Sequence, residues 1–393
     1  MDTMSFIPAY QPLPFPLPVW LMQILLILGF FLHALPMNVM LGGGFICAAL
    51  FLAGKHDQTS NAFRAARALA MSLPLFISFA ITQGIVPLLF VQLLYGPMFY
   101  TSSILMAVPW LTVIPLVLAS YYISYIVIYR ILLKEHNAGT ATKSAILLTI
   151  MGVMLAVVGF FFSNNMTLML TPDKWVAMYQ HSSHGLNLNL HEGQLIPRYT
   201  HFVVAAFAVA GMTLGCFGLY MLKREEQFGQ WMIRLGSKIF LYSTIVQIPV
   251  GLWFLFSLPQ QMSSKFLGGD IIATAVFGTS MALALVCILA TTISSNTASK
   301  PAFLAGLIGN ALLILAMIVN RHLLRLFYLN PHIQPESMPV ATQWDLFIIF
   351  LVSTVALIAY LVWLCRLVWT AFQKKAPDAT AMKQAGAPAA PVN

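Results

Sequence analysis

Long apolar runs follow one another along almost the whole chain, separated by short polar connections. A membrane-spanning helix needs about 20 apolar residues at a rise of about 1.5 Å per residue. Runs of that length or longer fall at 19–53, 70–95, 101–129, 144–169, 200–222, 238–258, 270–293, 301–324 and 344–370. The pattern predicts an all-α, polytopic membrane protein with about nine transmembrane helices. No internal repeat is evident in the sequence.

Composition supports the membrane interpretation and suggests three parts. Hydrophobic residues make up 60% of the chain and charged residues 8%, whereas about 25% of a soluble globular protein is charged. We expect residues 1–18, which lack the basic segment of a signal peptide, to form an extramembrane lead-in. Residues 19–370 form the predicted membrane domain, and residues 371–393 form a cytoplasmic tail whose composition favours disorder.

The positive charges divide unevenly between alternate connections. Fifteen of the 20 Lys and Arg residues fall on one side of the membrane, and five fall on the other: Lys174, Arg198, Lys265, Arg321 and Arg325. The positive-inside rule then places the N-terminus outside and the C-terminus inside, in the cell inner membrane. The formal charge of +9 is thus mostly topogenic charge beside anionic lipid headgroups of the bilayer. Nucleic-acid binding has no support.

Acidic residues and cysteines exclude several classes of function. All eleven Asp and Glu residues fall in connections or at helix ends, whereas proton-coupled transporters usually carry carboxylates inside the membrane. The four cysteines stand singly in apolar runs, with no Cys-x-x-Cys-His motif. Covalent c-type haem, iron–sulfur clusters and cysteine zinc sites are therefore unsupported.

Histidine is the remaining candidate for chemistry inside the apolar runs, at His33, His201 and His322. A neutral imidazole is a haem iron ligand, but a lone buried histidine is equally well explained by a hydrogen bond to a neighbouring helix. Three such positions together favour a cofactor. Gly42, Gly43 and Gly44 follow His33, and small residues admit either a flat macrocycle or close helix packing, of which packing is the commoner.

A second group of histidines, His181, His184 and His191, lies in the connection 170–199. Their spacing is compatible with a zinc or copper site. No carboxylate or thiolate stands in register with them, so a solvated interfacial loop is the favoured interpretation, and their role stays open.

At the first and second of the membrane histidines, the chain resembles subunit I of the cytochrome bd quinol oxidases. FLHALPMNVMLGGGF resembles the first-helix segment of that family, whose histidine is an axial haem ligand, and IPRYTHFVVAAFAVAGMTLGCFGLYMLK resembles the fifth-helix segment, whose histidine ligates the low-spin b haem. The family is a nine-helix haem protein with its N-terminus outside, which agrees with the orientation inferred from charge.

The resemblance implies specific haem ligands. His201 corresponds to the low-spin haem ligand, and AVFGTSMALALV places Met281 as the opposite ligand. His33 is implied as the ligand of another haem. The resemblance implies two or three haems of type b, with a d-type haem as an alternative at one site.

The segment NRHLLR replaces the family's eighth-helix motif and its ligating glutamate. His322 stands near the position of that glutamate and is implied as its substitute. Arg321 and Arg325 are implied as partners of haem propionates. The alternative is that these residues lie at the interface and contact lipid headgroups.

Departures from the family pattern shape the functional hypothesis. The third apolar run has none of the family's proton-delivering carboxylates, the loop between helices six and seven is short, and Thr279 and Ser280 stand where the family has an arginine. We therefore expect a haem-binding subunit of a respiratory complex that exchanges electrons with a quinol or an outer-side c-type cytochrome, beside a second membrane subunit. The runner-up is a bd-type terminal oxygen reductase, and the third hypothesis is a haem-free transporter or scaffold.

Overall fold

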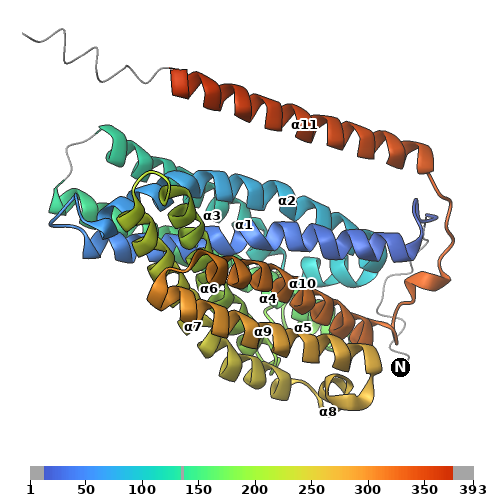
Figure 1. Cartoon of the computed structure of the whole chain (residues 1–393). Coiled ribbons are helices and arrows are strands. Elements are labelled where there is room, and N and C mark those ends of the chain that lie inside the picture. Colours follow the sequence, from blue (N-terminus) through green and yellow to red (C-terminus); the bar gives the residue numbers. More distant parts are fainter. Residues whose placement is uncertain (1–12, 134–136, 375–393) are drawn as a thin grey trace, which may run out of the picture. The chain divides into compact units, whose positions relative to one another are not determined.

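The computed structural model describes residues 13–133 and 137–374, and this part of the chain is almost entirely helical (Figure 1). Within it, eight helices are long and apolar enough to cross a membrane. Their bounds are α1 Val19–Ala53, α2 Asn61–Leu105, α3 Ala107–Leu133, α4 Ala138–Met169, α6 Leu195–Met221, α7 Glu226–Ser257, α9 Ile271–Thr297 and α10 Lys300–Leu329. Short helices α5 (Trp175–His181) and α8 (Gln260–Ser264) lie in connections, and α11 (Trp344–Lys374) adds a further 31 residues. The predicted all-α membrane class is confirmed.

Several helices extend beyond the apolar runs that predicted them. The largest difference is at α2, which begins at Asn61 rather than residue 70 and continues past a kink at Tyr95 (φ −133°, ψ 32°) to Leu105. Pro97 follows the kink by two residues, and a proline removes a helical hydrogen bond and clashes with the preceding turn. Because α2 continues past the kink to Leu105, residues 101–105 belong to α2. The third spanning helix, α3, therefore begins later than predicted, at Ala107.

The eight helices form two halves that repeat one packing pattern. In the first half α1 packs on α2, and α3 packs on α2 and α4; in the second half α6 packs on α7, and α9 packs on α7 and α10. The halves meet where α1 packs on α6, with reciprocal contacts of α1 with α10 and of α4 with α6. Equivalent helices α3 and α9 each have 27 residues. The fold thus contains a repeat that the sequence does not reveal.

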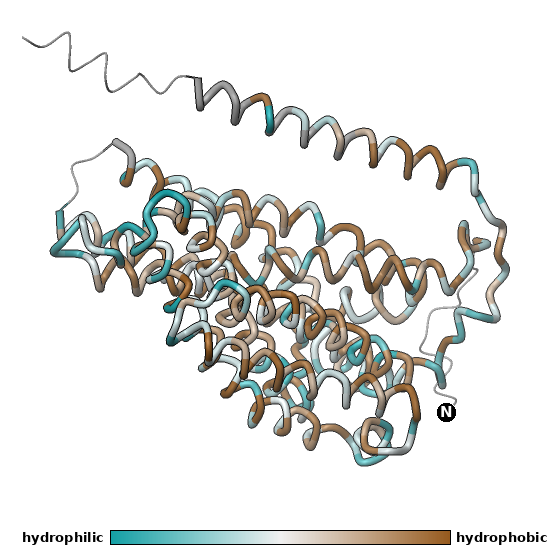
Figure 2. The backbone as a smooth tube through the Cα atoms, viewed as in Figure 1, coloured by the Kyte–Doolittle hydropathy of each residue, from teal (hydrophilic) through white to brown (hydrophobic). Residues whose placement is uncertain are grey.

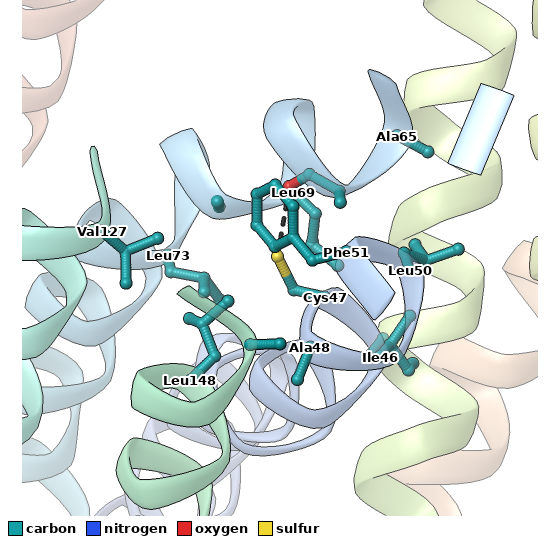
Figure 3. Close-up of a cluster of buried hydrophobic side chains, with 14 of the residues drawn as sticks. Ile46, Cys47, Ala48, Leu50, Phe51, Ala65, Leu69, Leu73, Val127 and Leu148 are labelled. Atoms are coloured by element: carbon teal, nitrogen blue, oxygen red, sulfur yellow. Dashed lines mark hydrogen bonds between the residues drawn. The ribbon is translucent and has the colours of Figure 1, made fainter. Parts of the chain in front are cut away.

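The densest core lies in the inner half of the helices, taking the predicted cytoplasmic side as inner (Figure 3). Cys47, Phe51 and Leu69 are each at most 1% exposed, and the Cys47 thiol donates a hydrogen bond to the Ala66 carbonyl at 3.1 Å. A Cβ atom at Gly42 would lie 2.2 Å from the carbonyl oxygen of Ala206 on α6, so only glycine permits this approach of α1 to α6.

The long helices are mainly apolar, and polar residues gather in the connections between them. Brown apolar segments occupy the middle of the helices and teal polar segments cluster at their ends and in the connections (Figure 2). Large apolar side chains also face outward, among them Leu111, Ile114 and Phe256, each between 67% and 70% exposed. An apolar exterior of this kind is what lipid requires.

Helix α11 belongs to a second compact unit, together with residues 14–18. Within this unit the Phe15 amide donates to the Pro339 carbonyl at 2.8 Å, and the Ala341 amide donates to the Phe15 carbonyl at 2.9 Å. Part of the predicted lead-in is therefore paired with the segment before α11. The predicted tail lies outside the described residues from position 375 onward.

Candidate functional site

Three arginines line one cavity at the predicted outer end of the bundle. The cavity is small, with room for about one water molecule, and is surrounded by side chains from α4, α6, α10 and the residue after α4: Met166, Met169, Leu170, Arg198, Arg321 and Arg325. Arg325 is only 7% exposed. A cavity whose polar lining consists of guanidinium groups is suited to an anionic ligand.

Within the described part of the chain these arginines form no ion pair with a carboxylate, although Glu192 interacts electrostatically with Arg198 at longer range. The ion pairs formed by the described residues are Arg64 with Glu225, and Lys174 with Glu192 at 2.7 Å. The guanidinium carbons instead lie over aromatic rings: Arg321 over Phe30 at 4.1 Å, Arg198 over Phe254 at 5.3 Å and Arg325 over Tyr95 at 5.8 Å. Cation–π contact offsets only part of the cost of moving a charge out of water. The cluster therefore favours binding of an anion.

His322 stands between two of these arginines on α10 and is 6% exposed. Its Nδ1 atom is buried without a hydrogen-bond partner. Two residues before it, the Asn320 side chain donates a hydrogen bond from Nδ2 to Ser280 Oγ on α9 at 3.0 Å. A buried imidazole nitrogen without a partner is costly in a membrane, and metal ligation or a hydrogen bond to a bound group would satisfy it.

His33 lies close to the arginine cluster through a shared neighbour. The Phe30 ring that Arg321 covers is 6.0 Å from the His33 ring, centroid to centroid. His33 Nδ1 lies 2.8 Å from the Ala80 carbonyl oxygen on α2. Because a carbonyl only accepts, Nδ1 carries the proton and Nε2 keeps its lone pair. This tautomer is the one that binds iron through Nε2.

His201 and Met281 are placed by different helices. His201 lies on α6, one turn from Arg198, and its Nδ1 atom is buried without a hydrogen-bond partner. Met281 lies on α9 and is 42% exposed, among the large apolar side chains that face outward. The His201 ring lies close to Gly251 on α7. Pairing of His201 with Met281 stays a prediction.

The histidines of the connection after α4 lie at the surface. His181, His184 and His191 are all exposed. Within residues 13–133 and 137–374, no group of three or more His, Cys, Asp or Glu side chains is arranged to hold a metal ion. Over the same ranges, every Asp and Glu lies in a connection or the first turn of a helix.

Sequence reasoning missed three residues of this region. Arg198 is predicted only as an outer charge, although its position three residues before His201 was a signal. Gly84 and Gly251 face the rings of His33 and His201. Contacts between residues so far apart in the chain depend on how helices cross, which the sequence pattern does not encode.

Comparison with known proteins supports the fold. No family model and no curated protein matches the sequence. The chain is similar to the structure of bd oxidase from Geobacillus thermodenitrificans, with a TM-score of 0.68 and 13% sequence identity, over 92% of this chain and 100% of that chain. This similarity shows a bd-oxidase-like fold, as the resemblance of the histidine segments predicts.

Proposed function

We propose that this chain is a haem-binding membrane subunit of a respiratory electron-transfer complex, which passes electrons through b-type haems to or from a quinol or an outer-side cytochrome. The observation that carries the proposal is the cavity lined by Arg198, Arg321 and Arg325, which form no ion pair with a carboxylate among the described residues. Arg198 precedes His201 by three residues, and Arg321 is next to His322 in the sequence. Haem offers both groups that this site lacks: propionate anions for the guanidinium groups and iron for imidazole.

The residues present fit haem by their chemistry. His322 and His201 each have a buried Nδ1 without a partner, and His33 has its Nδ1 bonded and its Nε2 available. His201 and Met281 would hold a low-spin haem, His33 and His322 would ligate further haem iron, and Arg321 and Arg325, with Arg198, would hold propionates. When bound, haem supplies one-electron chemistry. The chain's own residues orient the ligand, exclude water and offset anionic charge in the bilayer.

A second candidate function is oxygen reduction. The similarity to a bd oxidase structure favours it, whereas the apolar third spanning helix, α3, offers no carboxylate for delivering protons. We therefore keep electron transfer as the proposal, with a second membrane subunit as partner in the inner membrane. A haem-free transporter or scaffold is the third candidate.

A reduced-minus-oxidised visible spectrum of the purified protein separates the three candidates. Soret and alpha bands of b-type haem support the proposal. A d-type band, or a spectral change with carbon monoxide together with oxygen consumption, would move the assignment to an oxidase. Absence of haem bands in protein purified from haem-replete membranes would leave the transporter or scaffold.

Ligand variants test the individual assignments. His201→Ala and Met281→Ala should each remove the low-spin signal, and His33→Ala should remove that of another haem. His181→Ala is the matched control, because this histidine is exposed at the end of α5. Retention of the low-spin signal in His201→Ala would overturn the ligand assignment while leaving the haem proposal in place.

A further inference from the structure

Two glycines leave room for two of the membrane histidines. A Cβ atom built at Gly84 on α2 would lie 3.0 Å from both Cε1 and Nδ1 of His33. A Cβ atom built at Gly251 on α7 would lie 3.3 Å from Cε1 and 3.5 Å from Nδ1 of His201. Both contacts at Gly84 are tighter than ordinary van der Waals contact, as is the Cε1 contact at Gly251, whereas the Nδ1 contact at Gly251 is within the ordinary range. A side chain at either position would therefore crowd the imidazole.

The same edge of the ring faces the glycine in both pairs. At Gly84 the Nε2 atom of His33 is farther away, at 3.7 Å from the built Cβ, and at Gly251 only Cε1 and Nδ1 of His201 come within 4 Å. The space beside each glycine is therefore occupied by the Cε1–Nδ1 edge of the imidazole, and Nε2 lies farther from the glycine. In His33 the Ala80 carbonyl, one helical turn from Gly84, binds Nδ1 from the same side.

The two pairs occupy equivalent places in the two halves of the fold. His33 and Gly84 lie on α1 and α2, and His201 and Gly251 lie on α6 and α7. The histidine and its glycine are 51 residues apart in the first half and 50 in the second. Recurrence of the pair, with the same ring edge, is not expected of a glycine that serves helix packing alone.

Other glycines in the bundle show what packing looks like. A Cβ at Gly211 on α6 would lie 2.8 Å from the carbonyl oxygen of Gly236 on α7, and a Cβ at Gly42 would meet the backbone of Ala206. These glycines admit a neighbouring backbone. The three atoms nearest to a Cβ at Gly84, and both atoms within 4 Å of a Cβ at Gly251, belong to a histidine ring.

We propose that Gly84 and Gly251 are positioning residues, which set the orientation of the His33 and His201 imidazoles and direct Nε2 toward the ligand site. The inference rests on the proposed haem-binding function and adds residues to it. A methyl group at either position turns the ring of its own histidine and leaves the other histidine unchanged. Changes to groups that orient a metal ligand typically cost about 10- to 100-fold in metal affinity.

The test compares four variants of the full-length purified protein: Gly84→Ala, Gly251→Ala, Gly43→Ala and Gly211→Ala. The measurements are haem content, the electron paramagnetic resonance g values and the midpoint potential of each haem. We expect Gly251→Ala to shift the g values and potential of the His201 haem, and Gly84→Ala to shift the signal of the His33 haem. The shift at Gly84 should be larger, because its contact is shorter.

The controls separate positioning from packing. A Cβ at Gly43 would meet only side-chain carbons at 3.4 Å or more, so Gly43→Ala should behave as wild type. Gly211→Ala should lower the yield of folded protein while leaving the g values of the remaining haem unchanged.

Two outcomes would overturn different claims. If Gly84→Ala and Gly251→Ala bind haem with the g values and midpoint potentials of the wild type, the inference fails alone. If the wild-type protein itself shows no haem bands, the proposed function and the inference fail together. If an alanine variant loses haem, loss of only the signal of its own histidine's haem supports positioning, and loss of both haem signals contradicts it.

Discussion

The inner and outer halves of the helical bundle are built from the same helices but satisfy their side chains differently. In the inner half, Phe51 packs edge-to-face on Phe63 with ring centroids 5.5 Å apart, and the Cys47 thiol is bonded to a carbonyl. In the outer half, Arg325 has no carboxylate partner among the described residues, and His322 has a buried nitrogen without a hydrogen bond.

The contrast suggests that the inner half of the bundle stabilises the fold and that the outer half is suited to binding a ligand. Burial and close packing in the inner half stabilise the fold without any added group. Uncompensated charge and unpaired nitrogen in the outer half cost free energy until a ligand supplies their partners. Substitutions in the inner half should therefore change folding, and substitutions in the outer half should change what the protein binds.

The largest effect on folding is expected at Phe51, which is 1% exposed. Phe51→Ala should lower the free energy of unfolding by about 3–5 kcal/mol, since it removes a buried ring and leaves a cavity. Thermal unfolding in detergent measures the loss. Leu52→Ala is the control, because Leu52 is 45% exposed on the lipid-facing side of α1. Equal destabilisation by the two variants would contradict the importance of the inner core.

Substitution of Arg325 should have opposite effects on haem binding and on the stability of the haem-free protein. Arg325→Leu should weaken haem binding by about 3–5 kcal/mol, as removal of one partner of a buried ion pair typically does. The same variant should leave the haem-free protein equally stable or stabilise it by about 1–4 kcal/mol, because an apolar side chain replaces an unpaired buried charge. Thermal unfolding with and without haem measures both effects.

Arg67→Leu provides the comparison for this charge removal, since Arg67 is exposed at the inner end of α2. It should change neither haem binding nor stability appreciably. Destabilisation of the haem-free protein by Arg325→Leu would mean that the arginine is already satisfied, and the argument for an anionic ligand would fail.

A smaller effect is expected at Asn320, which is 8% exposed and donates to Ser280 at 3.0 Å. Asn320→Leu should destabilise the contact of α9 with α10 by about 1 kcal/mol, the usual net value of such a hydrogen bond. A double-mutant cycle with Ser280→Ala isolates the interaction. Additive effects of the two substitutions would show that the bond contributes no coupling energy.

The sequence predicted the helices well because lipid contact requires long apolar runs. The run 19–53 coincides with α1, Val19–Ala53. Prediction was poorer where a helix leaves the hydrocarbon: α7 begins at Glu226, twelve residues before the predicted start at 238, because a polar segment can remain helical outside lipid. The kink at Tyr95 was missed for a related reason, since hydropathy does not report backbone geometry.

The sequence points to most residues of the candidate site but not to how they come together. His322 stands out because it lies in an apolar run, and the resemblance to the cytochrome bd family implies Arg321 and Arg325. Their convergence with Arg198 depends on the packing of α6 near α10. Such long-range proximity follows from helix crossing, and a single sequence carries no direct signal of it.

The smallest effect is expected at the exposed inner end, where Glu225 accepts hydrogen bonds from Arg64, one of them from Nη1 at 2.7 Å. These hydrogen bonds, with the arginine charge, lower the pKa of Glu225 from its usual value. The stabilisation is therefore present above the usual carboxyl pKa and is lost as the pH falls through the lowered pKa. Glu225→Gln should flatten this part of the stability profile, with little change at neutral pH because exposed ion pairs contribute weakly. Thermal unfolding between about pH 3 and pH 7 measures it, with Glu226→Gln as the control, and an equal flattening by both variants would contradict a specific role for the Arg64 pair.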